Sequence, residues 1–114
     1  MKLSNTQKIF IQYCLANGLP SPVPEFRFCK RLWRIDYFFE LGGVKIGLEV
    51  QGGLFMHNGK GGRHNRATGY LKDMEKSNAM AIAGIFLIQV IPQNLLKKST
   101  IDLIKSVANL AEMP

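Results

Sequence analysis

The sequence predicts an α/β domain in which a small mixed β-sheet has flanking helices on both of its faces. Two runs rich in β-branched and aromatic residues, 33–41 and 44–51, flank a Gly-Gly pair and predict a β-hairpin. A helical pattern over 66–83 leads into the apolar run 85–91, and a strand entered after such a crossover usually pairs in parallel. The predicted order is helix, hairpin, helix, strand, helix.

Length and composition fit one domain that spans residues 1–114. The chain is 46% hydrophobic, which is enough for a modest core. It has no apolar run of about 18 residues or more and no signal-type apolar segment at its start, which predicts a cytoplasmic protein without membrane association. Cys14 and Cys29 lack metal-ligand spacing, so they predict buried reduced thiols rather than a disulfide or a zinc site.

The N-terminal part predicts one helix and one short extended segment. The helix is expected over 5–16 and ends near Gly18. Its apolar side would comprise Ile9, Phe10, Tyr13 and Cys14. The segment 21–24 (SPVP) predicts a stiff connector, and 25–28 predicts a short extended piece that leads into the hairpin.

The second half predicts a loop, a helix, a strand and a last helix. The segment 52–65 (GGLFMHNGKGGRHN) contains five glycines and no clear period, so it predicts a loop. The helix over 66–83 would have an apolar stripe of Ala67, Tyr70, Leu71, Met74, Ala81 and Ile82. The apolar run 85–91 is typical of a strand covered on both faces. The last helix, 100–112 with Thr100 as its N-cap, would pack through Ile101, Leu103, Ile104, Val107, Ala108 and Leu110.

The predicted hairpin places two carboxylates face to face. A two-residue turn pairs Leu41 with Val44. Counting back along both strands then puts Asp36 opposite Glu49. One face becomes apolar and the other charged, since the same register pairs Glu40 with Lys45, Phe39 with Ile46, Tyr37 with Leu48 and Ile35 with Val50. Like charges directly across a strand pair repel each other.

A hard divalent cation such as Mg²⁺ would offset this repulsion. It takes oxygen ligands, is commonly held by one or two carboxylates and keeps waters for chemistry on phosphate. In the alternative interpretation, Asp36 or Glu49 pairs with Arg34 on the same face, or a bulge breaks the register. The hairpin pattern leaves both interpretations open.

The net charge indicates an anionic partner. Fifteen Lys and Arg against eight Asp and Glu give a formal charge of +7, and much of the excess lies in two clusters without acidic residues. One cluster comprises Arg27, Lys30, Arg31 and Arg34, and the other comprises Lys60, Arg63 and Arg66 with His57 and His64. Such clusters are typical of nucleic-acid binding, and merely solvated surface is the alternative. Acidic membrane lipids fit less well, because no basic amphipathic helix with bulky apolar anchors is evident.

Asp36 on one strand and Glu49-Val50-Gln51 on the next resemble the motif of the PD-(D/E)XK nuclease superfamily, whose core order is helix, three strands, helix, strand. The segments RIDYFF, GLEVQGG and GGRHNRATGYLKDMEKSN are similar to small phage and bacterial endonucleases of that superfamily, related in fold to Holliday-junction resolvases and VRR-NUC proteins. The resemblance covers residues 25–92. It implies a restriction-endonuclease-like fold, DNA as partner, Mg²⁺ as cofactor with Mn²⁺ as a substitute, and the host-cell cytoplasm if the protein is phage-encoded.

The resemblance also implies roles for individual residues. Asp36 and Glu49 match the acidic metal ligands, and the carbonyl of Val50 would complete the metal shell. Gln51 stands where the superfamily usually has Lys. The missing charge could come from Lys72 or Lys76 on the following helix, from His64, or from Arg34, which the predicted register puts opposite Gln51.

Each of these substitutes has a simpler interpretation. On a helical wheel Lys72 and Lys76 lie opposite the apolar stripe, where they could be solvated or pair with Asp73 or Glu75. A phosphate contact fits His64 better than general-base catalysis, since it lies with Arg63 and Arg66 beside a helix start.

Further candidates are less specific. The residues expected to contact DNA are Arg34, Lys60, Arg63, His64, Arg66 and Lys72. The superfamily's first helix often supplies an acid, but the helix over 5–16 has none, so Glu25 is the nearest candidate. Trp33, Tyr37 and Phe39 are expected in the core, whereas Phe55 in the glycine-rich loop could touch DNA.

Three functions are compatible with these patterns. The favoured one is a Mg²⁺-dependent DNA endonuclease, either structure-specific like a Holliday-junction resolvase or DNA-nicking. A resolvase would need two active sites and hence a homodimer. The second is a non-catalytic DNA-binding module of the same fold. The third, a His-metal nuclease built from His57, Asn58, His64 and Asn65, lacks a supporting hairpin and further ligands.

Overall fold

The computed structural model describes residues 2–52 and 62–110, and the side chains of 62–68 lie outside this description. Four strands form one sheet in the order β1 (Val23–Arg27), β2 (Arg34–Leu41), β3 (Val44–Val50) and β4 (Ile85–Val90). The first three are antiparallel, and β4 is parallel to β3. The predicted small mixed sheet is therefore confirmed. Besides the two hairpin strands and the strand of the run 85–91, the sheet contains β1.

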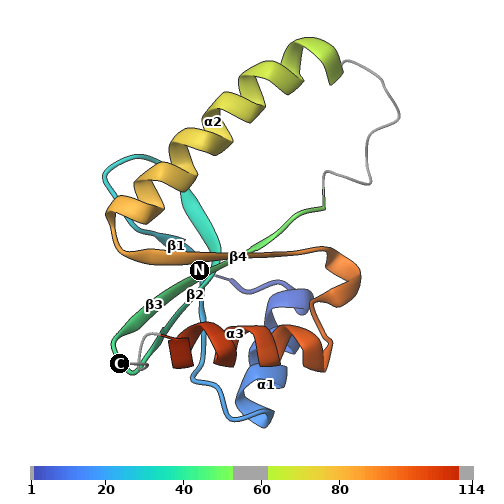
Figure 1. Ribbon diagram of the computed structural model, residues 1–114. Helices are drawn as coiled ribbons and strands as arrows, with labels where there is room; N and C mark the ends of the chain where they lie inside the picture. The colour runs from blue at the N-terminus through green and yellow to red at the C-terminus, as the bar shows by residue number, and fades with distance from the viewer. Residues whose placement is uncertain (1, 53–61, 111–114) are drawn as a thin grey trace.

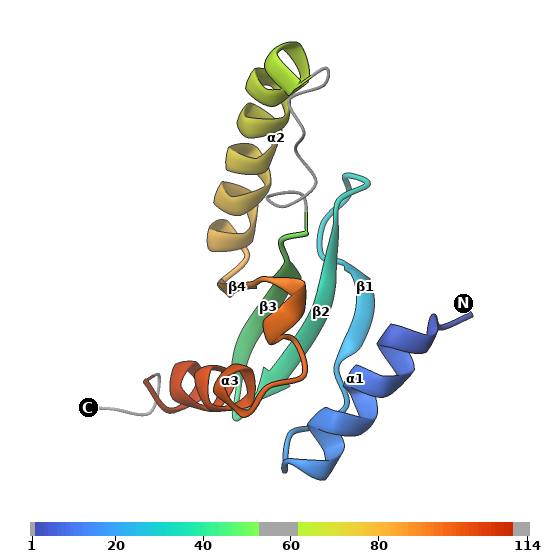
Figure 2. The ribbon, with the colours of Figure 1, turned by 90° about the vertical axis from the view of Figure 1, so that its right-hand side faces the viewer.

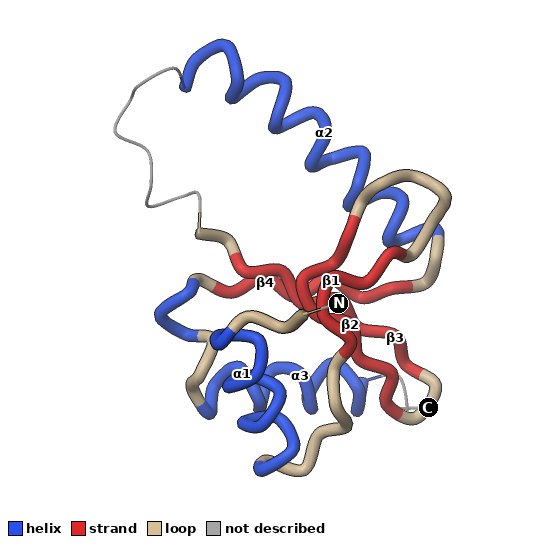
Figure 3. Tube along the Cα trace, turned by 180° about the vertical axis from the view of Figure 1, so that it is seen from behind, coloured by secondary structure: helices blue, strands red, loops and turns tan. Residues whose placement is uncertain are grey.

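The helices cover both faces of the sheet, as predicted. They are α1 (Asn5–Ala16), α2 (Gly62–Ile82) and α3 (Lys98–Leu110), with a short 3₁₀ turn, η2 (Pro92–Asn94), before α3. Figure 1 and Figure 3 show α1 and α3 together on one face and α2 on the opposite face. Figure 2 shows that α2 extends well beyond the sheet.

The larger core lies between the sheet and the helices α1 and α3. Phe10 of α1 packs on the ring of Tyr37, with ring centroids 4.5 Å apart, and α3 contributes Ile101 and Ile104. Phe10, Ile101, Ile104 and the strand residue Leu48 are fully buried. Full burial of such a side chain contributes roughly 1.5–3 kcal/mol. This cluster makes the α1/α3 side the main core of the domain.

The core beneath α2 is much smaller. It comprises Ile35, Phe38, Met80 and Ile85. The predicted apolar stripe of α2 is wrong, because Met80 is the buried residue while Ile82 is 89% exposed and Tyr70, Leu71 and Met74 are also exposed. The first half of α2 projects past the sheet and so has no apolar surface to cover (Figure 2).

Local sequence accounts for several element ends. Ser4 and Gln7 form a capping box at the start of α1. Gly42 and Gly43 have φ of 55° and 83°, as a primed two-residue hairpin turn requires, and the predicted turn is confirmed.

Several predicted boundaries need correction. The strand β1 includes Val23 and Pro24 of the expected connector. The helix α2 begins at Gly62, so His64 lies in a helix and not in a loop. The helix α3 begins at Lys98, and Thr100 is not its N-cap: it is buried inside the helix and its hydroxyl donates to the carbonyl of Asn94, 2.6 Å away.

Some predicted burial is also wrong. Phe86 on the edge strand β4 is half exposed, so that strand is not covered along its whole length. Ile9 and Cys29 are exposed, although Cys14 is a buried free thiol as expected. Trp33 lies in the β1–β2 connection and belongs to neither core cluster, because its ring packs against the guanidinium of Arg31.

Gly47→Ala should destabilise the fold by about 1–3 kcal/mol, because the sheet and α2 approach closely there. An added Cβ would lie 2.6 Å from Met80 Cε, 3.1 Å from Ile35 Cγ2 and 3.2 Å from Ile85 Cγ2. Urea unfolding would measure the loss. Gly69→Ala in α2 is the matched control, since its Cβ meets nothing within 4 Å. Equal midpoints of urea unfolding for the two variants would contradict tight packing at Gly47.

Candidate active site

The strands β2 and β3 separate at one end of the hairpin. Their pairing runs from Leu41 opposite Val44 to Tyr37 opposite Leu48, which confirms the predicted register over that length. β3 then continues alongside β4 as far as Val50, and the N–H of Gln51 donates to the carbonyl of Val90 at 2.8 Å. Asp36 and Glu49 are the first residues beyond the last β2–β3 pair.

Strands β1 and β2 also change face at this point, whereas β3 alternates regularly. Ile35 packs in the small cluster with Phe38, although residues three apart on a regular strand point to opposite faces. On β1, Phe26 stacks on Phe38 at 4.1 Å, and the preceding residue, Glu25, has a φ of 49°. The predicted position of Ile35 on the face of Tyr37 is therefore wrong. The β2–β3 pairing ends just before Asp36 and Glu49, and the pairs that are present keep the predicted register.

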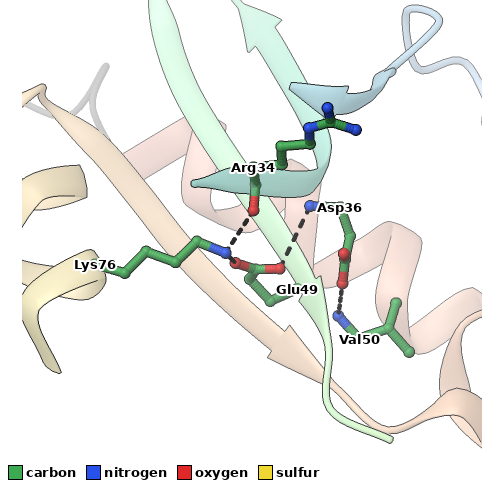
Figure 4. A network of polar contacts seen from close by, with 5 residues as sticks. All are labelled: Arg34, Asp36, Glu49, Val50 and Lys76. Carbon is green, nitrogen blue, oxygen red and sulfur yellow. Dashed lines mark hydrogen bonds and ion pairs between the residues drawn. The ribbon is translucent and has the colours of Figure 1, made fainter. Parts of the chain in front are cut away.

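Side-chain hydrogen bonds close the split between β2 and β3 (Figure 4). The N–H of Asp36 donates to Glu49 Oε2 at 3.3 Å, and the N–H of Val50 donates to Asp36 Oδ2 at 2.8 Å. Each carboxylate thus accepts a backbone N–H of the opposite strand, in place of the backbone carbonyl that a continuous ladder would supply. These bonds hold both acids in defined positions.

Lys76 of α2 completes this network. Its ammonium contacts Glu49 Oε1 and the backbone carbonyl of Arg34 (Figure 4). The side chains of Lys76 and Glu49 are only 21% and 12% exposed. Lys76 therefore points into the site from α2, and it pairs with neither of the helical neighbours that the sequence offered.

The effects that raise the pKa of Glu49 outweigh those that lower it. Burial raises the pKa of Glu49, and the charge of Asp36 raises this pKa further, while the hydrogen bond and charge of Lys76 lower it. Burial is the largest of these effects, so the pKa lies above its ordinary value. The ionised carboxylate is thus only partly compensated by Lys76.

A hollow of about 600 Å³ opens between the split and α2. The sheet lines it with Asp36, Glu49, Val50, Gln51, Leu87 and Gln89, and α2 lines it with Tyr70, Asp73, Met74, Lys76, Ser77, Asn78 and Met80. Sequence reasoning missed Asp73, Gln89 and the helix residues Tyr70 and Ser77. Tyr70, Asp73 and Ser77 follow the spacing of one helix face, a signal that could have grouped them.

The remaining predicted residues lie elsewhere. The side chain of Arg34 points away from Glu49 in Figure 4 and pairs with Glu25 at 3.6 Å, so Arg34 offers the site its carbonyl only. Lys72 lines a different hollow. Arg63, His64 and Arg66 belong to α2, but their side chains, with that of Asn65, lie outside the described residues, as do Lys60, His57, Asn58 and Phe55 entirely.

Comparison of the chain with protein-family models, with curated proteins and with solved structures gave no match. In the described part of the chain, no helix combines the length and apolar character needed to cross a bilayer. The site must therefore be interpreted from its own chemistry.

The donor set fits a hard cation. Asp36 and Glu49 supply carboxylate oxygens, the ligands that Mg²⁺ prefers. Burial and the charge of Asp36 disfavour the ionised form of Glu49 and so raise its pKa, and a nearby cation would stabilise that ionised form. Among residues 2–52 and 69–110 no group of three His, Cys, Asp or Glu side chains converges, so these two carboxylates would leave further metal positions to backbone oxygen, water or substrate.

The pKa of Glu49 should respond in opposite directions to two substitutions. Lys76→Met should raise it, because a hydrogen bond and a positive charge are lost, and Asp36→Asn should lower it, because a negative charge is lost. Titration of the Glu49 carboxyl ¹³C signal would measure both changes. Lys72→Met, one helical turn from Lys76, is the control and should leave this pKa unchanged.

Glu49→Gln should alter how stability depends on pH. Because the folded-state pKa of Glu49 is raised, its contribution to stability is fully present below the unfolded value near 4.5 and is lost as the pH rises through the folded pKa. The variant should therefore gain stability relative to wild type between acid and neutral pH. Urea unfolding across this range would measure the difference, and Glu40→Gln, exposed on β2, controls for the lost charge. A pH-independent difference would contradict the raised pKa.

Proposed function

We propose that this protein is a Mg²⁺-dependent endonuclease that hydrolyses phosphodiester bonds in DNA. The observation that carries the proposal is the pair Asp36 and Glu49, held at a split in the sheet beside Lys76, on the wall of an open hollow. The element order from α1 to β4 is the order that the resemblance to PD-(D/E)XK nucleases implies, and it supports the same proposal.

DNA is the proposed partner because of charge. A chain of net charge +7 attracts a polyanion, and its basic residues would neutralise phosphates. Two half-buried carboxylates beside a phosphate path would weaken a protein that only binds DNA. Their presence therefore favours catalysis over binding alone.

Asp36 and Glu49 would hold the metal, with the backbone carbonyl of Val50 as a third ligand. When bound, Mg²⁺ supplies charge relief at the reacting phosphate and makes a bound water more nucleophilic, and Mn²⁺ is the proposed substitute. The hydrogen bonds from the N–H groups of Asp36 and Val50 orient the two carboxylates. This preorganisation lets them bind a cation without first rearranging the strands.

Lys76 is the proposed replacement for the lysine that position 51 lacks. It reaches Glu49 from α2, so a positive charge is present although Gln51 contributes none. In this role its ammonium stabilises negative charge on the phosphate, and the amide of Gln51 orients a water by hydrogen bonding. Both residues line the same hollow as the carboxylates.

The proposal includes two types of endonuclease, which differ in the form of DNA that they cut. A structure-specific enzyme that cuts a four-way junction symmetrically needs two active sites, which implies a homodimer. A nicking enzyme can act as a monomer. In either form the protein would work in the cytoplasm, in that of the host cell if it is phage-encoded.

Cleavage of a supercoiled plasmid and of a synthetic four-way junction tests the proposal. Wild type should cut one of them with Mg²⁺ and not with EDTA. Asp36→Asn and Lys76→Met should each reduce the rate by about 100-fold or more, because each removes a charge at the reacting centre. Lys45→Met, on the exposed face of β3, is the control and should cut normally.

Binding measurements complete this experiment. If wild type and Asp36→Asn bind both DNAs and neither DNA is cut with Mg²⁺ or Mn²⁺, the endonuclease proposal is wrong. The non-catalytic DNA-binding module then becomes the better explanation. Loss of cutting in Lys45→Met as well would show that general charge, and not the site, controls the rate.

A further inference from the structure

A second hollow lies between the β1–β2 connection, residues 28–33, and α2. Its volume is about 560 Å³, and it is lined by Lys30, Arg31, Leu32, Trp33, Lys72 and Glu75. We call these six residues the connection surface. It is separate from the hollow at Asp36 and Glu49, although α2 contributes residues to both.

The connection surface displays an exposed apolar side chain together with cationic ones. Leu32 is 82% exposed, between Arg31 and Trp33 in the chain. The Arg31 guanidinium lies 4.2 Å from the centroid of the Trp33 ring and 3.7 Å from Glu75. These contacts hold the base of the connection against α2 and leave Leu32 projecting.

Charge on the connection surface favours a polyanion. Lys30, Arg31 and Lys72 outnumber the single acid, Glu75, which is already paired with Arg31. A projecting aliphatic side chain flanked by Lys and Arg is the arrangement that DNA-bending proteins use, with the apolar group inserted at a base step and the cations on adjacent phosphates. An apolar protein partner would make no use of the charges of Lys30 and Lys72, the cations of this surface other than Arg31.

We propose that the connection surface binds DNA at an unstacked base step, with Leu32 as an inserted wedge and with Lys30 and Lys72 on the flanking phosphates. This inference takes its substrate class from the proposed function but does not depend on catalysis. It assigns the connection a recognition role, because steps that unstack easily, such as those at a junction, require the least energy to open.

Lys72 places the connection surface close to the active-site hollow. Lys72 and Lys76 are one helical turn apart on the same side of α2, which is about 6 Å along the helix axis. Lys72 lines the connection surface and Lys76 contacts Glu49. The wedge would therefore open the DNA within a few nucleotides of the bond that is cut.

Fluorescence of 2-aminopurine tests the wedge directly. A duplex and a four-way junction carrying this base would be bound by Asp36→Asn, which removes cleavage from the measurement. Binding should increase the fluorescence at a step near the junction. Adding Leu32→Ala should abolish the increase and weaken binding about tenfold. Adding Ile82→Ala, which removes a side chain of similar exposure from the far end of α2, should change neither.

The salt dependence of binding tests the two lysines. Lys30→Ala and Lys72→Ala should each reduce the slope of log K against log salt by about 1, whereas Leu32→Ala should leave the slope unchanged. The wedge is wrong if Leu32→Ala behaves like Ile82→Ala in fluorescence and affinity, even if wild type cuts DNA. If wild type cuts nothing while the Leu32-dependent signal appears, the wedge stands and the nuclease proposal fails.

Discussion

The separation of β2 from β3 beyond Tyr37 and Leu48 is the feature on which the candidate site depends. A sheet that opens leaves backbone N–H groups without strand partners, and such groups are costly to leave unsatisfied. Here the carboxylates of Asp36 and Glu49 accept them. These hydrogen bonds reduce the free-energy cost of opening the sheet, and they also hold the two acids beside each other. The path of the backbone and the arrangement of the acids therefore depend on the same hydrogen bonds.

The two faces of the sheet have different tasks. The face covered by α1 and α3 has the larger apolar core and supplies stability. The other face has only a small cluster around Met80, and from there α2 extends beyond the sheet. A helix with little to bury can expose polar side chains, and Asp73 and Lys76 face the site hollow for this reason. Stability and proposed function are thus separated by face.

A positive charge on α2 lies next to the negative charges on β2 and β3. Burial of Glu49 next to Asp36 would be unfavourable without a nearby cation, and Lys76 supplies one charge to two acids. The residual negative charge favours a further cation. The basic connection surface adjoins the site along α2, so further positive charge lies near the two acids. This arrangement is compatible with the proposed phosphate backbone beside the proposed metal site.

The sequence by itself determined the hairpin, its turn at Gly42-Gly43 and the helix α1, because short-range hydrogen bonding and apolar periodicity encode them. It also predicted the mixed sheet, because a strand that follows a helical crossover usually pairs in parallel. It also singled out Asp36 and Glu49. Only the tertiary structure decided where β2 leaves β3, because that depends on β3 continuing with β4, a strand distant in sequence. It likewise decided that Lys76 meets Glu49 and that Trp33 stays out of the core. A helical wheel shows which residues share a face, but the neighbour of that face depends on how α2 packs.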